Sequence, residues 1–221
     1  MYKPQEILEI AGYAAEIMMK NGGETYRVEE MIGYICSSAN MENIASFVTP
    51  TGIVISLSKN GEPPETIVKR IRERGTNLEK VSLINDFSRK IGVEQWGYHE
   101  AMGRLKEVDY KKEYPHKIGI IFASGLASGA FTIFLGGFWI DVLPSIVASL
   151  IIQTIIFYSI VKDITFFSDF TGGFLAGTLG IIFIKLGFGV SLDRIVIGAI
   201  IPLVPGLAIT NAVRDAIKGE L

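Results

Sequence analysis

Long apolar runs dominate the second half of the chain. Between residues 118 and 161 the sequence has a single charged side chain, Asp141. As a helix, each of the first two runs is about long enough to cross a hydrocarbon layer of roughly 30 Å, and two runs of similar length follow. A buried helix of a soluble protein could explain one such run, but not four in succession. The pattern predicts an α-helical membrane domain of about four transmembrane helices: Ile118–Ile140, Val142–Val161, Phe170–Val190 and Ile195–Val213.

In the first half of the chain, apolar residues recur at the spacing of amphipathic helices and strands. Apolar residues recur at three- and four-residue spacing in four segments, which predicts helices, and alternate with polar residues between them, which predicts strands. The turn signals are Asn21-Gly22-Gly23 after the first helix and Asn60-Gly61 in a hairpin. We expect a small α+β domain, residues 1–114, followed by the membrane domain, residues 115–221. Its elements are helices Pro4–Lys20 and Glu24–Ala39, strands Ile44–Thr49, Ile53–Leu57 and Thr66–Arg72, and helices Asn77–Ile91 and Glu94–Val108.

Charged residues are distributed between the two halves of the chain as unevenly as apolar residues are. Residues 1–115 carry 32 of the 44 acidic and basic side chains, and the formal net charge is −2. This near-neutral balance, without a large basic cluster, argues against nucleic acid as a partner. Cys36 is the single cysteine, so an intrachain disulfide is impossible. Its place on the apolar side of a helix predicts an ordinary core thiol.

The flanking charges predict the orientation in the membrane. The sequence opens without the basic and apolar run of a signal peptide, which places the first domain in the cytoplasm. Positive residues gather on the cytoplasmic side of membrane helices. Here they precede the first run, follow the second and follow the fourth: Lys111, Lys112, Lys117, Lys162, Arg214 and Lys218. We expect a multi-pass protein of the plasma (inner) membrane with a cytoplasmic N-terminal domain.

The last apolar run is interrupted by prolines, each of which removes a helix hydrogen-bond donor. Backbone groups freed at membrane depth are costly unless protein or water satisfies them. A polar helical face follows the break, and together these features predict a substrate or ion path. The alternative is a kinked helix with an ordinary interfacial end. The expected path residues are Pro202, Pro205, Gly206, Thr210, Asn211, Arg214 and Asp215, with Asp141 from the earlier runs.

Small residues are dense in the apolar runs. Pairs at four-residue spacing put two small side chains on one helix face, which lets a second helix approach closely, although generic packing explains them equally well. The pairs are Ser124-x-x-x-Ser128, Gly125-x-x-x-Gly129 and Gly173-x-x-x-Gly177. A weak internal repeat places Asp141 and Asp193 at equivalent positions, each four residues after a glycine. Chance explains that match equally well.

Catalytic signals are poor in the first domain. His99-Glu100 lacks the second histidine of a zinc-protease helix, and no phosphate loop or nucleophile elbow is present. The sequence indicates no metal site and no cofactor. Its one concentrated polar segment covers residues 22–29. Taken alone, this segment is a corner between two helices with an acidic first turn that suits the helix dipole.

Three segments, taken together and in this order, resemble the signatures of the threonine/serine exporter family. The resemblance covers essentially the whole chain. The segments are Gly22-Gly23-Glu24-Thr25-Tyr26-Arg27-Val28-Glu29, Phe47-Val48-Thr49-Pro50-Thr51-Gly52, and Pro205-Gly206-Leu207-Ala208-Ile209-Thr210-Asn211-Ala212-Val213-Arg214-Asp215.

The resemblance implies a cytoplasmic domain on a helical membrane domain that exports small hydrophilic metabolites, coupled to the proton gradient. Threonine- and serine-like amino acids and small dicarboxylates are the implied cargoes. The chain is similar to the N-terminal half of split members, which implies a second small membrane subunit, a homo-oligomer, or both. Family members continue beyond Arg214-Asp215 into a further hydrophobic segment, so we expect a trimmed or shortened chain.

Three hypotheses follow. In the leading one the chain is a transporter subunit, in which Arg214 binds a cargo carboxylate, Thr210 and Asn211 hydrogen-bond neutral groups, and Asp215 or Asp141 carries a proton. In the second it is a membrane-anchored hydrolase, with Glu24, Thr25 and Glu29 at its site. In the third it is a regulatory or scaffold subunit without a path of its own.

Overall fold

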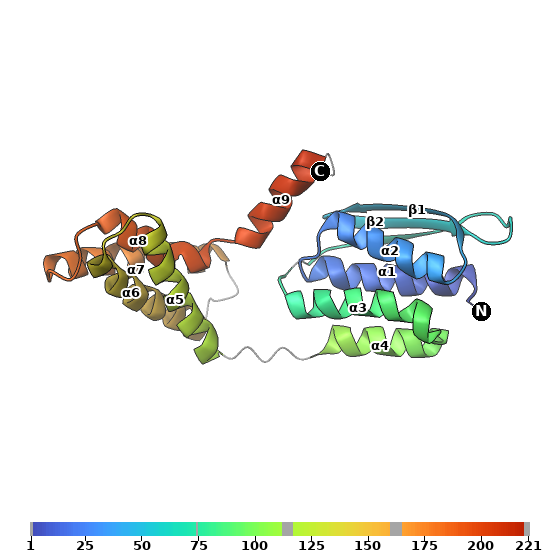
Figure 1. Ribbon diagram of the computed structural model, residues 1–221, viewed down its shortest axis with the longest axis horizontal. Coiled ribbons are helices and arrows are strands. Elements are labelled where there is room, and N and C mark those ends of the chain that lie inside the picture. Colours follow the sequence, from blue (N-terminus) through green and yellow to red (C-terminus); the bar gives the residue numbers. More distant parts are fainter. Residues whose placement is uncertain (1, 74, 112–116, 160–164, 219–221) are drawn as a thin grey trace. The chain divides into compact units, whose positions relative to one another are not determined.

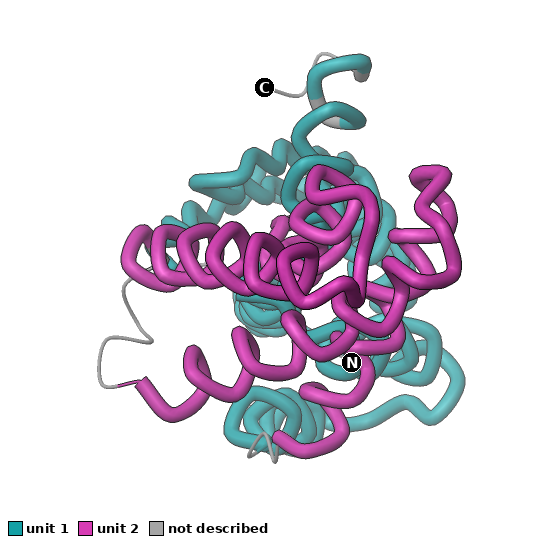
Figure 2. Tube along the Cα trace, turned by 90° about the vertical axis from the view of Figure 1, so that its left-hand side faces the viewer, with its two compact units in different colours: residues 1–112, 206–221 teal, residues 113–205 magenta. Residues whose placement is uncertain are grey.

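The computed structural model describes residues 2–73, 75–111, 117–159 and 165–218. Its contacts divide the chain into two compact units (Figure 2). The N-terminal unit comprises residues 1–112 and 206–221, and the helical unit comprises residues 113–205. Residues 206–221 are thus grouped with the N-terminal unit, whereas our sequence-based division places them in the membrane domain.

The N-terminal unit contains a three-stranded antiparallel sheet and five helices within the described ranges. Its elements are α1 (Pro4–Lys20), α2 (Thr25–Ser38), β1 (Glu42–Thr49), β2 (Gly52–Ser58), β3 (Glu65–Arg70), α3 (Leu78–Glu94), α4 (Tyr98–Tyr110) and α9 (Gly206–Lys218). The strands lie in chain order, with β2 between the other two. Helices α1 and α2 pack on the sheet, and α3 and α4 pack on those helices in turn (Figure 1).

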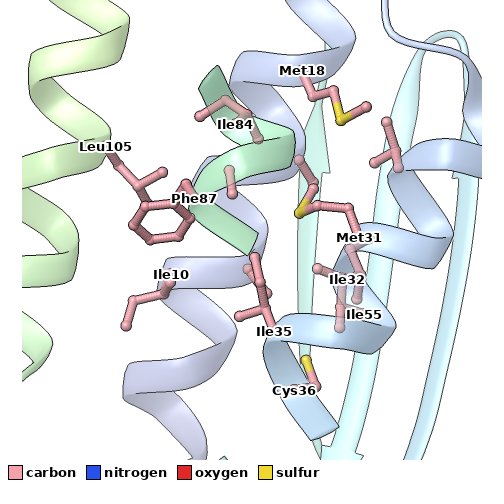
Figure 3. Close-up of a cluster of buried hydrophobic side chains, with 14 of the residues drawn as sticks. Ile10, Met18, Met31, Ile32, Ile35, Cys36, Ile55, Ile84, Phe87 and Leu105 are labelled. Carbon is pink, nitrogen blue, oxygen red and sulfur yellow. The ribbon is translucent and has the colours of Figure 1, made fainter. Parts of the chain in front are cut away.

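The core of this unit lies between the sheet and its helices. Strand β2 buries Ile53, Ile55 and Leu57 at alternate positions, the period expected of a strand with one covered face. Side chains from α1, α2, α3, α4 and β2 meet there (Figure 3). Cys36 is fully buried among them, which confirms the predicted core thiol, and burial raises the pKa of this thiol to about 12.

Turn residues end the elements largely where the sequence predicts. Gly22 follows α1 with φ +90°, and Asn60 and Gly61, with φ of 52° and 74°, lie in the connection between β2 and β3. Two adjoining boundaries are wrong: α3 ends at Glu94 instead of Ile91, and α4 begins at Tyr98 instead of Glu94. The reason is Gln95, which adopts the left-handed conformation and ends α3 there.

The described part of the helical unit contains α5 (Lys117–Phe134), α6 (Trp139–Tyr158), α7 (Thr165–Lys185), α8 (Leu192–Ile200) and the 3₁₀ turn η1 (Ile201–Leu203). Among described residues, α5, α6 and α7 are long and apolar enough to cross a membrane. The number rises to four if α8, η1 and α9 are counted as one broken span. The described residues therefore contain three or four candidate membrane spans, in line with the four that the sequence predicts.

Glycines shift the ends of these spans from the predicted positions. Helix α5 stops at Phe134 rather than Ile140, because Gly136 has φ +78° and the amide of Gly137 caps the carbonyl of Thr132 at 2.8 Å. Helix α7 likewise ends at Lys185, shortly before Gly187 with φ +78°. Left-handed glycines at helix ends have this effect because they have no Cβ atom to strain.

The interruption predicted in the last apolar run is confirmed. Pro202 lies in η1, and Val204 and Pro205 separate that turn from α9. Val204 is extended, with φ −69° and ψ 126°, as expected of a residue that precedes a proline.

Close packing on small residues is confirmed for one glycine pair and not for the other. A Cβ atom added to Gly125 or Gly129 would lie 2.9 Å from Leu150 or 2.8 Å from Ile146 of α6, so α5 and α6 approach closely there. A Cβ atom on Gly173 or Gly177 would meet no described atom within 4 Å. On α7 the packed glycines are instead Gly172 and Gly180, which contact η1 and α8.

Candidate functional site

The first sequence signature forms the corner between α1 and α2. Gly23 is needed at the turn, because a Cβ atom there would lie 2.8 Å from the carbonyl oxygen of Met18. Glu24 follows at the N-cap position of α2, but its carboxylate makes no capping hydrogen bond. Thr25 is buried in the first turn of the helix. The corner therefore presents a backbone carbonyl at Gly22 and a carboxylate at Glu24.

The third signature, on α9, contacts this same corner. The guanidinium of Arg214 forms an ion pair with Glu24 and lies 5.9 Å from the centroid of the Tyr26 ring. The side-chain amide of Asn211 donates a hydrogen bond to the carbonyl of Gly22 at 3.4 Å. Two signatures almost two hundred positions apart in the sequence are thereby brought together.

A second arginine shares the carboxylate. Nε of Arg27 lies 3.0 Å from Oε2 of Glu24. The Glu24 side chain is 18% exposed, whereas those of Arg27 and Arg214 are 57% and 39% exposed. We call Gly22, Glu24, Tyr26, Arg27, Asn211 and Arg214 the corner cluster. Its two guanidinium groups face one carboxylate, which leaves one positive charge in excess on a surface that solvent reaches.

The remaining signature residues of this unit hold its backbone together. Glu29 accepts a hydrogen bond from the amide of Val48 at 3.0 Å, which ties α2 to β1. Thr49 Oγ1 accepts hydrogen bonds across Pro50, from the amide of Gly52 at 3.0 Å and from that of Thr51 at 3.4 Å. These contacts shape the turn between β1 and β2, and they do not bring Thr49, Pro50 or Thr51 to the corner cluster.

A set of hydroxyl groups is buried between α5, α6 and α8. Oγ of Ser128 lies 2.6 Å from Oγ of Ser145, and Oγ1 of Thr132 lies 2.7 Å from the same Ser145 atom. Gly198 of α8 covers them, because a Cβ atom there would lie 2.1 Å from Oγ1 of Thr132 and 2.6 Å from Oγ of Ser145. All three hydroxyl residues are fully buried.

The polar row continues along α6. Ser149 is fully buried, and its Oγ has no hydrogen-bond partner within the part of the chain that the structure describes. Gln153, one turn further, is 8% exposed. We call Ser128, Thr132, Ser145, Ser149 and Gln153 the hydroxyl seam. Ser128, Thr132 and Ser145 hydrogen-bond to one another, and an unpaired buried hydroxyl such as that of Ser149 is costly unless another polar group reaches it.

Sequence reasoning missed the hydroxyl seam, although a signal was present. Ser124, Ser128 and Thr132 recur every four residues in one apolar run, as do Ser145, Ser149 and Gln153 in the next. Such spacing puts the polar side chains on one face of each helix. The spacing of Ser124 and Ser128 alone predicts close helix packing, and it does not show that Ser145 of the next run faces Ser128.

Asp141 lies elsewhere in the helical unit and anchors a loop. It is fully buried at the start of α6, and its carboxylate accepts hydrogen bonds from the amides of Phe138 (3.1 Å), Val190 (2.6 Å) and Ser191 (3.1 Å). The carboxylate thus caps α6 and holds the connection between α7 and α8. Asp193, which occupies the equivalent position in the weak internal repeat, is exposed in the first turn of α8.

The other predicted path residues are scattered. A cavity of about 220 Å³ lies in the helical unit beside Pro205, with Asp169 and Gly173 in its wall. Thr210 returns its hydroxyl to the carbonyl of Gly206 at 2.9 Å. Asp215 lies in α9, and its side chain is outside the part that the structure describes. Of the predicted path, the described contacts therefore bring together Asn211 and Arg214, at the corner cluster.

Apolar helices long enough to cross a bilayer, with polar side chains buried between them, are typical of a helical membrane protein. Residues 9–221 match the ThrE family, described as "Putative threonine/serine exporter". The chain belongs to this family, as the three signatures led us to expect.

Three relatives support the assignment. The chain is 26% identical to a "Probable threonine/serine exporter" of Mycobacterium tuberculosis and 23% identical to a "Threonine/serine exporter" of Corynebacterium glutamicum. Those matches cover 98% and 96% of this chain but 41% and 45% of the two relatives. A "Probable succinate transporter subunit YjjP" of Klebsiella aerogenes is 23% identical over 92% of this chain and 79% of its own length. No solved structure matches the chain.

The family and its named relatives are transporters and not enzymes. The match therefore gives no support to the hydrolase alternative. In the described structure, Glu24 and Glu29 also serve an ion pair and a backbone hydrogen bond, respectively. No group of three or more histidine, cysteine, aspartate or glutamate side chains placed to hold a metal ion occurs among the described residues.

Proposed function

We propose that the chain is a subunit of a membrane exporter for small hydrophilic metabolites, and that the hydroxyl seam is where cargo crosses its helical unit. The observation that carries the proposal is the fully buried Ser149 hydroxyl, which has no partner among the described residues and lies in a row of polar side chains within apolar helices. Transport of a polar solute requires groups that replace its water, and such groups inside a membrane helix are a functional signal.

The seam is closed in this conformation. Gly198 packs directly on Thr132 and Ser145, and these hydroxyls hydrogen-bond to one another. Movement of α8 away from α5 and α6 would free the hydroxyls for cargo. A small hydroxylated amino acid or a dicarboxylate can then exchange hydrogen bonds with them, so threonine, serine and succinate are the cargoes to test. The names of the relatives include all three.

The corner cluster supports a second role, in which Arg214 receives the cargo carboxylate. Its guanidinium already binds a carboxylate, that of Glu24, and remains 39% exposed. The excess positive charge of the cluster favours a second anion. A cargo carboxylate would compete with Glu24 for Arg214 and loosen α9 from the corner. Asn211, released from Gly22, would supply a neutral hydrogen bond.

Topology, coupling and assembly complete the proposal. The positive residues that flank the apolar runs favour a plasma-membrane protein with the N-terminal unit in the cytoplasm. We assign the coupling to protons, with Asp215 or Asp141 as carrier. A second membrane subunit completes the path, since a relative is itself named a subunit and the chain spans less than half of the two exporters.

Flux measurements test the proposal. Inverted membrane vesicles containing the chain, with and without the second subunit, are given labelled threonine, serine or succinate, with and without a proton ionophore. The informative variants are Ser149→Ala in the seam and Arg214→Ala in the corner cluster. We expect both to reduce flux at least about tenfold, the effect of losing an interaction worth about 1.4 kcal/mol.

Lys111→Ala is the matched control, because Lys111 forms an exposed ion pair with Glu79 at 2.6 Å on the same unit as Arg214. Wild-type flux in Ser149→Ala and Arg214→Ala would contradict the assigned roles. If the second subunit transports at full rate without this chain, the exporter proposal fails and the chain is a regulatory or scaffold subunit.

A further inference from the structure

A cavity of about 560 Å³ opens in the N-terminal unit, where α1 begins and where α2 and α3 end. This volume lies within the range of about 300–1,000 Å³ typical of small-molecule sites. The residues that line it include three aromatic residues, one acid and one serine: Tyr2, Trp96, Tyr98, Glu6 and Ser38. None of these residues belongs to the corner cluster or the hydroxyl seam. We call this space the aromatic cavity.

The aromatic walls are held in place before any ligand arrives. The hydroxyl of Tyr2 donates to the backbone carbonyl of Trp96, and the Trp96 indole donates to Glu94 at 3.0 Å. The hydroxyl of Tyr98 donates to Glu9 at 2.5 Å. Trp96 is 6% exposed. Fixed walls lower the entropic cost of binding, because the protein has little left to order.

The described lining of the aromatic cavity carries one formal charge, which is negative, while the ammonium group of Lys59 lies outside the lining, 2.7 Å from the carbonyl oxygen of Tyr2. The negative charge belongs to Glu6, and the described lining contains no lysine or arginine. Burial raises the pKa of Tyr2, and the charges of Glu100 and Glu6 raise it further. The pKa of Tyr98 is raised mainly by its hydrogen bond to Glu9, then by burial and by the charges of Glu9 and Glu6. The carboxylates of Glu6, Glu9 and Glu100 thus help to keep both hydroxyls protonated, beside burial and the hydrogen bond to Glu9.

One positively charged side chain of the protein itself, that of Arg104, already lies against an aromatic ring of this wall. The guanidinium of Arg104 lies 4.2 Å from the centroid of the Trp96 ring and is paired with Glu100 at 3.0 Å. Aromatic faces beside carboxylates are the groups that bind organic cations. Because Arg104 and the Phe87 ring already pack against Trp96, we propose that the aromatic cavity binds a small organic cation with a primary ammonium group, held by Glu6 and by the rings of Tyr2 and Tyr98.

Tryptophan fluorescence of the full chain in detergent tests the proposal. The sequence has two tryptophans, and Trp139 is 81% exposed in the helical unit, so a Trp139→Phe background leaves Trp96 as the reporter. The probes are 1,4-diaminobutane, threonine and succinate at millimolar concentration. They compare a simple amine, an ammonium group within an amino acid, and an anion.

Two substitutions should weaken binding by about tenfold, the effect of losing one charge-assisted contact. Glu6→Gln removes the carboxylate, and Ser38→Arg places a positive charge in the wall. Each has a matched control outside the cavity, Glu62→Gln in an exposed loop and Ser37→Arg beside Ser38 on the exposed side of α2. Ser38→Arg keeps the test valid if loss of the Glu6 contact to the amide of Lys3 unfolds the first variant.

Saturable binding of 1,4-diaminobutane, threonine or both, weakened in the two cavity variants and unchanged in their controls, supports the proposal. The probe that binds more tightly then identifies the ligand as a simple amine or an amino acid. The proposal is overturned if neither ammonium compound saturates the Trp96 signal, if succinate binds as tightly, or if Ser38→Arg and Ser37→Arg have equal affinities. None of these outcomes depends on export, so they leave the proposed function untouched.

Discussion

Replacing Asp141 tests whether this buried carboxylate is an anchor. Asp141→Ala removes the acceptor of three backbone amides, those of Phe138, Val190 and Ser191. Asp141→Asn keeps the shape and one acceptor oxygen. Its new amide group, however, would face a donor, either the amide of Phe138 or those of Val190 and Ser191. The anchor interpretation predicts that both variants loosen the connection between α7 and α8, and that alanine does so more strongly.

The structure gives the size of the effect. Hydrogen bonds to a charged group contribute about 1.5–3 kcal/mol each, but water can partly replace them where the donor is near the surface. The hydrogen bonds from Phe138, Val190 and Ser191 are only partly buried, so the freed amides can recover part of the loss. For Asp141→Ala we therefore expect a loss of about 3 kcal/mol of unfolding free energy. For Asp141→Asn we expect a loss of about 1–2 kcal/mol of unfolding free energy, because the asparagine side-chain NH₂ group faces a backbone N–H donor while its oxygen still accepts.

Thermal unfolding in detergent and hydrogen exchange measure the global and the local effect. In Asp141→Ala the amides of Val190 and Ser191 should lose protection while the middle of α6 keeps it. Asp193→Ala is the control, because Asp193 is exposed and should change stability by less than about 0.5 kcal/mol. Wild-type stability and loop protection in Asp141→Ala would refute the anchor interpretation. Lost transport with an intact loop in Asp141→Asn would instead identify a proton carrier.

Three further predictions concern packing, the buried thiol and the corner cluster. Gly198→Ala should lower the unfolding free energy by about 1–3 kcal/mol, because the added Cβ atom would overlap the hydroxyl seam. Gly173→Ala is its control, because a Cβ atom there meets open space and the variant should be neutral or more stable. Thermal unfolding in detergent compares the two variants. Cys36 should resist maleimide at pH 7.5 in the folded protein and react once unfolded. Because folding raises its pKa from 9.0 to about 12, the unfolding free energy should fall as pH rises above about 9, which denaturation at two alkaline pH values measures. Glu24→Arg should increase hydrogen exchange in α9, and the added Arg214→Glu should restore protection; failure of the double variant to do so would contradict the ion pair. Because this pair is partly exposed, its expected contribution is at most about 1 kcal/mol.

Much of the fold follows from local sequence patterns. The spacing of apolar residues predicts every helix and strand of residues 1–110, and the apolar runs predict the candidate spans. The errors lie at boundaries such as Gln95 and Gly136, where one residue in a left-handed conformation ends a helix earlier or shifts the next one. Periodicity locates the middle of an element, but its end depends on the conformation of a single residue.

The candidate site was harder to predict. Proline and glycine at residues 202–206 correctly indicate a broken helix, and the three signature segments correctly indicate the family. Nothing in the order of residues shows that Arg214 pairs with Glu24, or that Ser128 faces Ser145. These contacts depend on which helix faces pack together, and that choice is made by the whole core.

The sequence by itself determined which segments are helical, which are apolar enough for a membrane and where the last span breaks, because each depends on residues near one another in the chain. The tertiary structure decided which polar residues act together. Asp141 and Asp193 look equivalent in the sequence, yet one is buried under three amides and the other is exposed. The reason is physical: burial removes water from a polar group, and only the folded neighbours decide whether another group replaces it.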